Sequence, residues 1–209
     1  MSILIPPGYL LENPQWVSVV DIPRKGGEEV LKYLLEGAEE TTGIKDAPDS
    51  WGCSMLTSYG SNINILEQVE LNTLSTLIMQ EVLKYVEFVD REHIGAHTLK
   101  LDNSFFNIGG KGSYQEFHTH LPSNVSFVYY VQALPEQGNI VFNGFNPPSL
   151  PWAYHGVDVP PITGRLVIFP SHTPHQVIRN RTEGLRVSIA GNCTAALEQP
   201  WDIDPTTLF

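Results

Sequence analysis

The chain has 209 residues, of which 42% are hydrophobic, so it is long enough for one domain with a substantial core. Twelve lysines and arginines against 23 aspartates and glutamates give a net charge of −11, which argues against a nucleic-acid partner. The two cysteines form neither a disulfide framework nor a CxxC site. With no signal peptide and no apolar run near the ~20 residues that cross a bilayer, we expect a cytoplasmic protein without a membrane partner (in the host cytoplasm if the source is viral).

Helical periodicity dominates the first 95 residues, in two segments at residues 28–39 and 65–89. The apolar positions are Val30, Leu31, Leu34 and Leu35 in the first segment, and Ile65, Val69, Leu71, Leu74, Leu77, Ile78 and Val82 in the second. Amphipathic helices need a surface to pack against, so we expect residues 1–95 to form a largely helical part packed on a sheet.

From residue 96 the pattern changes to short alternating runs separated by glycine and proline. The candidate strands span residues 96–107, 113–119, 124–133, 138–143, 165–169, 174–180 and 185–191. Strands at this spacing are typical of a sandwich or barrel. We expect one domain, with a β core over residues 96–192 and a C-terminal tail over residues 193–209.

One connection, residues 143–163, breaks this rhythm with five prolines and no periodicity. A loop of this length inside a compact domain is usually functional or disordered. Trp152, Tyr154 and His155 could give it a binding face, so we interpret it as a lid.

The sharpest local motif is His118-Thr119-His120. Residues i and i+2 of a strand point to the same face, so both imidazoles can reach one ion. His175 on a later strand could complete a set of three ligands, which leaves coordination positions open for catalysis. Imidazole suits Fe(II), Zn, Cu and Ni alike. The alternative is that the HxH pair is two surface histidines.

Arg186 follows His175 by eleven residues, across an expected hairpin turn at residues 180–184, and shares a strand face with Ser188. A guanidinium binds a carboxylate bidentately, and the hydroxyl can add one hydrogen bond. This strand face could therefore bind the carboxylate of an acidic co-substrate. The alternative is an arginine in a structural ion pair.

From about residue 100 to residue 192, the chain resembles the Fe(II)/2-oxoglutarate-dependent oxygenases, especially the prolyl-hydroxylase-like group and phage and bacterial members. The matching pieces are Tyr114-x-x-x-His118-x-His120, Val125-Ser126-Phe127-Val128-Tyr129-Tyr130, Gly138-x-Ile140-x-Phe142, Gly164-x-Leu166-x-x-Phe169-Pro170 and His175-x-Val177 with Gly184-x-Arg186-x-Ser188. The resemblance implies a mainly β fold with flanking helices, a double-stranded β-helix (jelly roll) with the N-terminal helical segment packed on it.

The resemblance also implies roles for single residues. His118 corresponds to the first metal ligand and His175 to the distal histidine. Arg186, with Ser188, corresponds to the partner of the far carboxylate of 2-oxoglutarate. Two further residues are candidates for the co-substrate pocket, Tyr130 by its strand face and Asn107 by its place before a glycine turn.

His120 departs from the family, which normally has Asp or Glu at this position. A neutral imidazole raises the charge of the centre by one unit, which favours Fe(II) over Fe(III). Three readings stay open: a three-histidine ligand set, a site with His120 turned aside, and a carboxylate supplied by Glu116.

The implied activity is a dioxygenase that uses Fe(II), 2-oxoglutarate as co-substrate, O2, and ascorbate as a reductant to hydroxylate a C–H bond of a small molecule or peptide. No residue outside the metal centre is expected to be catalytic. The alternatives are a cupin-like three-histidine metalloenzyme without 2-oxoglutarate and a non-catalytic module. The sequence carries no signal for an oligomeric state. His172 is expected at a loop or rim, and His93 and His97 away from the site.

Overall fold

A computed structural model describes residues 2–5, 17–23, 27–37, 39–143 and 156–197. The elements, with η for a 3-10 helix, are β1 (Ser2–Ile5), β2 (Val17–Asp21), α1 (Gly27–Glu36), α2 (Glu39–Thr42), β3 (Lys45–Asp46), η1 (Asp49–Trp51), β4 (Leu56–Thr57), η2 (Ile65–Glu67), η3 (Val69–Leu71), α3 (Asn72–Val89), η4 (Arg91–His93), β5 (His97–Gly109), β6 (Gln115–His118), β7 (Val125–Gln132), β8 (Ile140–Asn143), β9 (Gly156–Val159), β10 (Arg165–Pro170), β11 (His175–Val177) and β12 (Arg186–Leu197). Within these ranges, no helix is both long and apolar enough to span a membrane.

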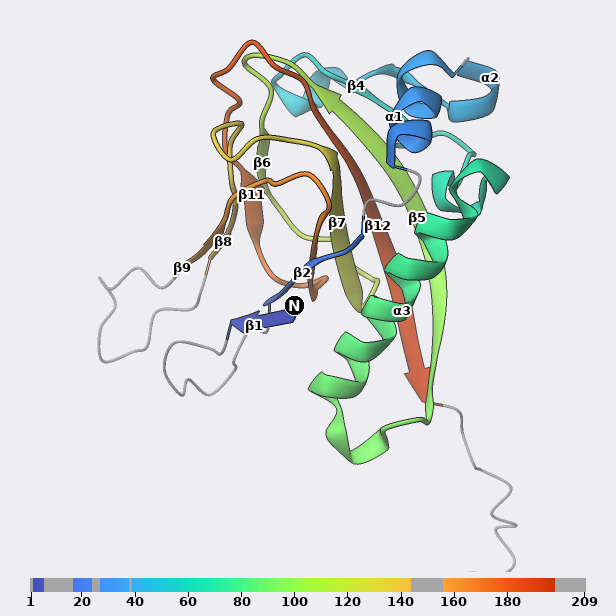
Figure 1. The fold of residues 1–209 in the computed structure, drawn as a ribbon. Helices are drawn as coiled ribbons and strands as arrows, with labels where there is room; N and C mark the ends of the chain where they lie inside the picture. The colour runs from blue at the N-terminus through green and yellow to red at the C-terminus, as the bar shows by residue number, and fades with distance from the viewer. Residues whose placement is uncertain (1, 6–16, 24–26, 38, 144–155, 198–209) are drawn as a thin grey trace, which may run out of the picture.

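The strands form two sheets that face each other (Figure 1). The larger sheet has the order β1-β2-β10-β7-β12-β5-β4-β3, and the smaller one has the order β6-β11-β8-β9. Neighbouring strands run antiparallel. This two-sheet architecture with few helices confirms the expected jelly roll.

The helices α1 and α3 pack on the outer face of the larger sheet (Figure 1). Strand side chains alternate between faces, so Ile189 of β12 and Phe127 of β7 point to the helices. They meet Leu34 of α1 and Ile78 of α3, both fully buried. This core confirms that the N-terminal helical segment covers the sheet.

A second core lies between the two sheets. It joins Val167 and Phe169 of β10 to Ile140 and Phe142 of β8. All four side chains are fully or almost fully buried, and their packing holds the two sheets together.

The N-terminal part is less helical than the periodicity predicts. Strands β1 to β4 all come from it and extend both ends of the larger sheet. Helix α3 begins only at Asn72, because residues 65–71 form two 3-10 turns. Leu35 and Val69, expected on the apolar stripes, are 42% and 71% exposed.

Two boundaries in the C-terminal half also differ from the prediction. Strand β12 continues to Leu197, so the expected tail boundary at residue 193 falls inside a strand that remains paired with β5. Part of the expected loop, Gly156–Val159, is the edge strand β9. The expected lid residues Trp152, Tyr154 and His155 lie outside the described residues.

Candidate metal centre and adjoining cavity

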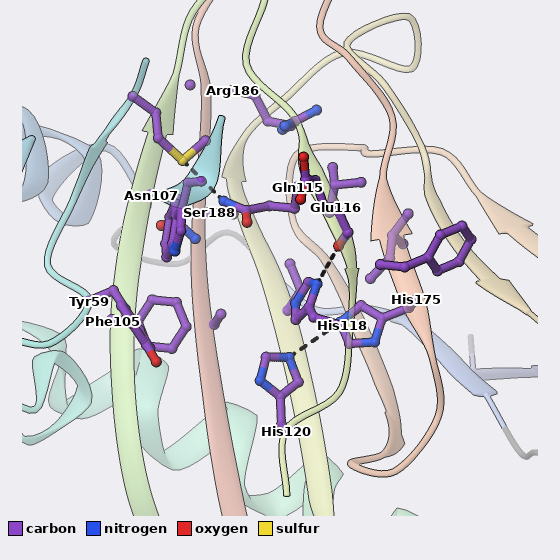
Figure 2. Close-up of a pocket in the computed structure, with 18 of the residues that line it drawn as sticks. Tyr59, Phe105, Asn107, Gln115, Glu116, His118, His120, His175, Arg186 and Ser188 are labelled. Atoms are coloured by element: carbon purple, nitrogen blue, oxygen red, sulfur yellow. Dashed lines mark hydrogen bonds between the residues drawn. The ribbon is translucent and has the colours of Figure 1, made fainter. Parts of the chain in front are cut away.

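Three histidines meet at the inner face of the smaller sheet (Figure 2). The antiparallel register places His118, at the end of β6, opposite His175 on β11. His120 follows just beyond the strand, while the intervening Thr119 is exposed, as the alternation predicts. One ring nitrogen from each histidine lies within 4.8 Å of the other two. The structure therefore brings together the three side chains that the sequence analysis grouped.

Hydrogen bonds orient two of the rings. His118 Nδ1 lies 2.6 Å from the carbonyl oxygen of Glu116, and His175 Nδ1 lies 2.9 Å from that of Thr173. A carbonyl oxygen only accepts, so Nδ1 carries a proton in each ring and Nε2 is the atom available to a metal. Histidines that bind metals usually have this arrangement.

His120 is held through its backbone. Its N–H donates to the carbonyl of Ser171 at 2.8 Å, and its Nε2 lies 3.3 Å from Nε2 of His175. Burial lowers the pKa of His120 to about 4 and that of His175 to about 3, and the neighbouring His118 contributes in the same direction. Both imidazoles are therefore neutral at neutral pH, the form that binds a metal. The ring of His120 is not turned aside.

No carboxylate joins the three histidines among the described residues. Glu116 is exposed and lines the adjoining cavity, outside the ligand group. Of the three arrangements that the sequence left open, the geometry favours the three-histidine ligand set. Such a donor set fits Fe(II) and leaves open coordination positions.

Arg186 lies at the start of β12 and lines the same cavity (Figure 2), and only 5% of it is exposed. Its Nη1 donates to the carbonyls of Gln137, Gly138 and Ile178. Gly138 has a φ of +94°, and a Cβ there would collide with the Ile178 carbonyl, so glycine is required for this close approach. No carboxylate pairs with Arg186 in the described part of the chain, contrary to the structural ion-pair alternative.

A row of polar side chains crosses the larger sheet beside Arg186. Ser188 lies opposite Asn107 on β5 and opposite Tyr130 on β7. Asn107 Oδ1 accepts a hydrogen bond from Thr57 at 2.7 Å. The Tyr130 hydroxyl is buried without a hydrogen-bond partner among the described residues. Burial raises the pKa of Tyr130 to about 12, so the hydroxyl stays a neutral donor.

One cavity of about 330 Å³ connects the three histidines with Arg186 and the polar row. This volume is within the range of small-molecule sites. The unpartnered Tyr130 hydroxyl and the Arg186 guanidinium give the cavity two donors suited to a carboxylate. The residues present thus fit both Fe(II) and an acidic co-substrate.

The sequence analysis missed one wall of this cavity. Ser50, Trp51, Met55 and Tyr59, from the N-terminal part, also line it. The only sequence signal for this wall is its aromatic residues. The pattern around Trp51 does not distinguish an aromatic residue that lines a cavity from one that packs in a core.

The other histidines of the described ranges lie where expected. His172 is exposed in the loop before β11. His93 and His97 both contact the carboxylate of Asp90, at 3.0 and 3.1 Å, near the junction of α3 and β5.

The fold and the site define a jelly-roll protein with a three-histidine centre beside a cavity that Arg186 and Tyr130 line. Residues 103–192 match the family model described as putative 2OG-Fe(II) oxygenase. These residues carry the three histidines, Arg186 and the polar row. The match over these residues confirms the resemblance to the 2OG-Fe(II) oxygenases that the motifs indicate.

Solved structures share the fold. The α-ketoglutarate-dependent epimerase SnoN from nogalamycin biosynthesis has a TM-score of 0.64 at 15% identity, over 87% of this chain and 79% of its own. A Pseudomonas putida prolyl-4-hydroxylase has a TM-score of 0.58 at 16% identity, over 85% of this chain and 91% of its own. HygX from Streptomyces hygroscopicus was solved with nickel, 2-oxoglutarate and hygromycin B bound. It has a TM-score of 0.57 at 13% identity, over 85% of this chain and 82% of its own. No curated protein is similar enough in sequence to match.

Proposed function

We propose that the protein is an Fe(II)- and 2-oxoglutarate-dependent dioxygenase that hydroxylates a C–H bond of a small molecule or peptide. The observation that carries this proposal is the pairing, in one cavity, of three convergent imidazoles with an unpartnered tyrosine hydroxyl and a buried arginine that has no carboxylate partner among the described residues. The family match to residues 103–192 supports it.

Fe(II), 2-oxoglutarate and O2 would together supply the oxidation: one oxygen atom enters the substrate as a hydroxyl and the other enters succinate, with release of carbon dioxide. In this proposal the Nε2 atoms of His118, His120 and His175 would hold the metal. Arg186 and Tyr130 bind the far carboxylate of 2-oxoglutarate, with Ser188 and Asn107 beside them. Apolar side chains between the sheets, such as Phe169 and Val128, exclude water from the centre.

The substrate class rests on what similar folds bind. HygX was solved with hygromycin B, and a prolyl hydroxylase from Trichoplax adhaerens with a fragment of hypoxia-inducible factor. A small molecule and a peptide are thus both compatible with this architecture. A cytoplasmic location and a single-domain organisation are also proposals. The two cysteines support the first, because neither Cys53 nor Cys193 is in a disulfide.

The test is a titration of anaerobic protein with Fe(II) and 2-oxoglutarate, followed by visible absorption, and then by succinate formation when air and ascorbate are added. We expect the Fe(II)–2-oxoglutarate charge-transfer band and slow succinate release. The His175→Ala variant should lose both, whereas His172→Ala, which changes an exposed histidine, should keep both.

Metal binding without any 2-oxoglutarate affinity would overturn the proposal in favour of a cupin-like metalloenzyme. The specific observation behind that second candidate is His120 in place of a carboxylate. A protein that retains no divalent metal would point to a non-catalytic module.

A further inference from the structure

The cavity wall that faces the histidines is aromatic. The rings of Trp51 and Tyr59 lie 5.4 Å apart, and those of Tyr59 and Phe105 lie 5.0 Å apart in an edge-to-face contact. Figure 2 shows Tyr59 and Phe105 across the cavity from His118 and His175. Tyr59 stays 46% exposed, so its ring is available to a ligand.

Backbone hydrogen bonds hold the segment that carries Tyr59. The Tyr59 N–H donates to the Thr57 hydroxyl at 3.0 Å, and the adjoining Ser58 N–H bonds to the Phe106 carbonyl on β5. Tyr59 is therefore anchored to the larger sheet rather than carried on a free loop. A backbone fixed in this way can hold its aromatic side chain ready for a ligand.

Glu116 gives this side of the cavity its charge. Among the described residues that line the cavity, it is the one carboxylate, and Arg186 is the one permanent cation. The Glu116 Oε1 atom lies 3.4 Å from the place that a Cβ on Gly52 would occupy, so it stands beside the backbone next to Trp51. The ion pairs of the described residues do not include it.

The two charged residues differ in what they can bind. Arg186 is enclosed by three backbone carbonyls and, in the proposed function, faces the co-substrate. An acidic substrate would then find no second cation among the described residues of the wall. A cationic substrate would find both a carboxylate and aromatic faces, which attract ammonium and guanidinium groups.

We propose that the group admitted to the metal centre is an aliphatic chain ending in an ammonium or guanidinium. Its methylene groups lie against Tyr59 and Phe105, and its charge lies between Glu116 and Trp51. This inference rests on the proposed function, because it places the chain beside the metal-bound co-substrate. A free amine and a lysine or arginine side chain of a peptide share this chemistry.

The test uses matched probes on protein loaded with Fe(II) and 2-oxoglutarate without oxygen. Hexylammonium is compared with 1-hexanol, and a capped Gly-Lys-Gly peptide with its norleucine counterpart. Binding is measured by calorimetry and by the change in the charge-transfer band. We expect each cation to bind about three- to tenfold more tightly than its neutral partner, the size of a partly exposed cation–π contact or ion pair. The arm with the larger preference identifies a free amine or a peptide as the source.

Two substitutions test whether Glu116 and Tyr59 make the proposed contacts with the cationic chain. Glu116→Gln should abolish the larger part of the preference for cations, and Tyr59→Leu should weaken both members of each pair. Glu29→Gln, which makes the same charge change on the exposed face of α1, should leave the preference intact.

Equal binding of charged and neutral probes, absence of binding by both cations, or a preference that survives Glu116→Gln would overturn the inference. Loss of the charge-transfer band in the unsubstituted protein would instead overturn the proposed function, so the two failures are distinguishable.

Discussion

Ser188 on β12 lies directly opposite Tyr130 on β7, at the centre of the larger sheet. Because side chains alternate along a strand, both face the interior between the sheets. Only 1% of Tyr130 is exposed, yet its hydroxyl has no partner among the described residues. A buried polar group without a hydrogen-bond partner costs free energy. The polar side chains beside Tyr130 are therefore suited to a ligand that accepts a hydrogen bond from its hydroxyl.

The Tyr130→Phe substitution separates binding from folding. It removes a hydroxyl that has no partner in the described structure, so the free energy of unfolding should stay the same or rise. The dissociation constant for 2-oxoglutarate should rise by about tenfold or more, since a hydrogen bond to a charged group contributes about 1.5–3 kcal/mol. Urea unfolding and titration of the charge-transfer band measure the two effects.

The matched control is Tyr129→Phe. Tyr129 is the next residue on β7, and it belongs to the core under the helices. Its substitution should leave the affinity for 2-oxoglutarate unchanged. If Tyr130→Phe has no larger effect on affinity than this control, Tyr130 does not contact the co-substrate.

His120 allows a direct comparison with the carboxylate usual in the family. His120→Ala should lower the affinity for Fe(II) by at least about 10- to 100-fold, because loss of even an outer partner of a metal ligand has an effect of this size. His120→Asp should restore much of that affinity, since a carboxylate also binds Fe(II). Metal titration under anaerobic conditions gives both values. Equal affinity in the alanine variant and the unsubstituted protein would remove His120 from the ligand set.

The sequence could group the candidate site residues because their relationships are local or set by strand parity. His118 and His120 share a short motif, and Arg186 and Ser188 share a strand face. Only the fold could reveal the wall built by Trp51 and Tyr59, because their contact with the cavity depends on strands paired across about fifty residues of chain.

The fold was predictable where hydrophobic periodicity is long, and less so elsewhere. The eighteen-residue helix α3 was found, but its start was placed too early because residues 65–71 carry apolar residues at a helical spacing while forming 3-10 turns. The two-residue strands β3 and β4 are too short for any alternation to be read.

Helix α1 provides a test of which apolar positions support the fold. Leu34 is fully buried under the larger sheet, whereas its neighbour Leu35 is 42% exposed. Leu34→Ala should therefore lower the free energy of unfolding by about 2–5 kcal/mol through lost burial and a cavity. Leu35→Ala should change it by less than about 1 kcal/mol. Urea unfolding of the two variants checks this, and similar losses in both would contradict the packing of α1.

The metal-free protein should lose stability as the pH falls. Burial holds the pKa of His120 at about 4 and that of His175 at about 3 in the folded state. In the unfolded chain both side chains take up protons near pH 6.5. Between these values the unfolded state binds more protons, so the free energy of unfolding decreases as the pH is lowered through this window.

Urea unfolding of chelator-treated protein from about pH 7.5 to about pH 5 measures this dependence. The double variant His120→Gln/His175→Gln keeps every carboxylate, so its own acid sensitivity is the baseline. The free energy of unfolding should fall more steeply with decreasing pH in the unsubstituted protein. Its two buried imidazoles stay neutral in the folded state but take up protons when the chain unfolds, and the double variant lacks both of them. Equal slopes would mean that the two imidazoles take up protons in the folded state as readily as in water, and the cluster would then not be preformed for metal binding.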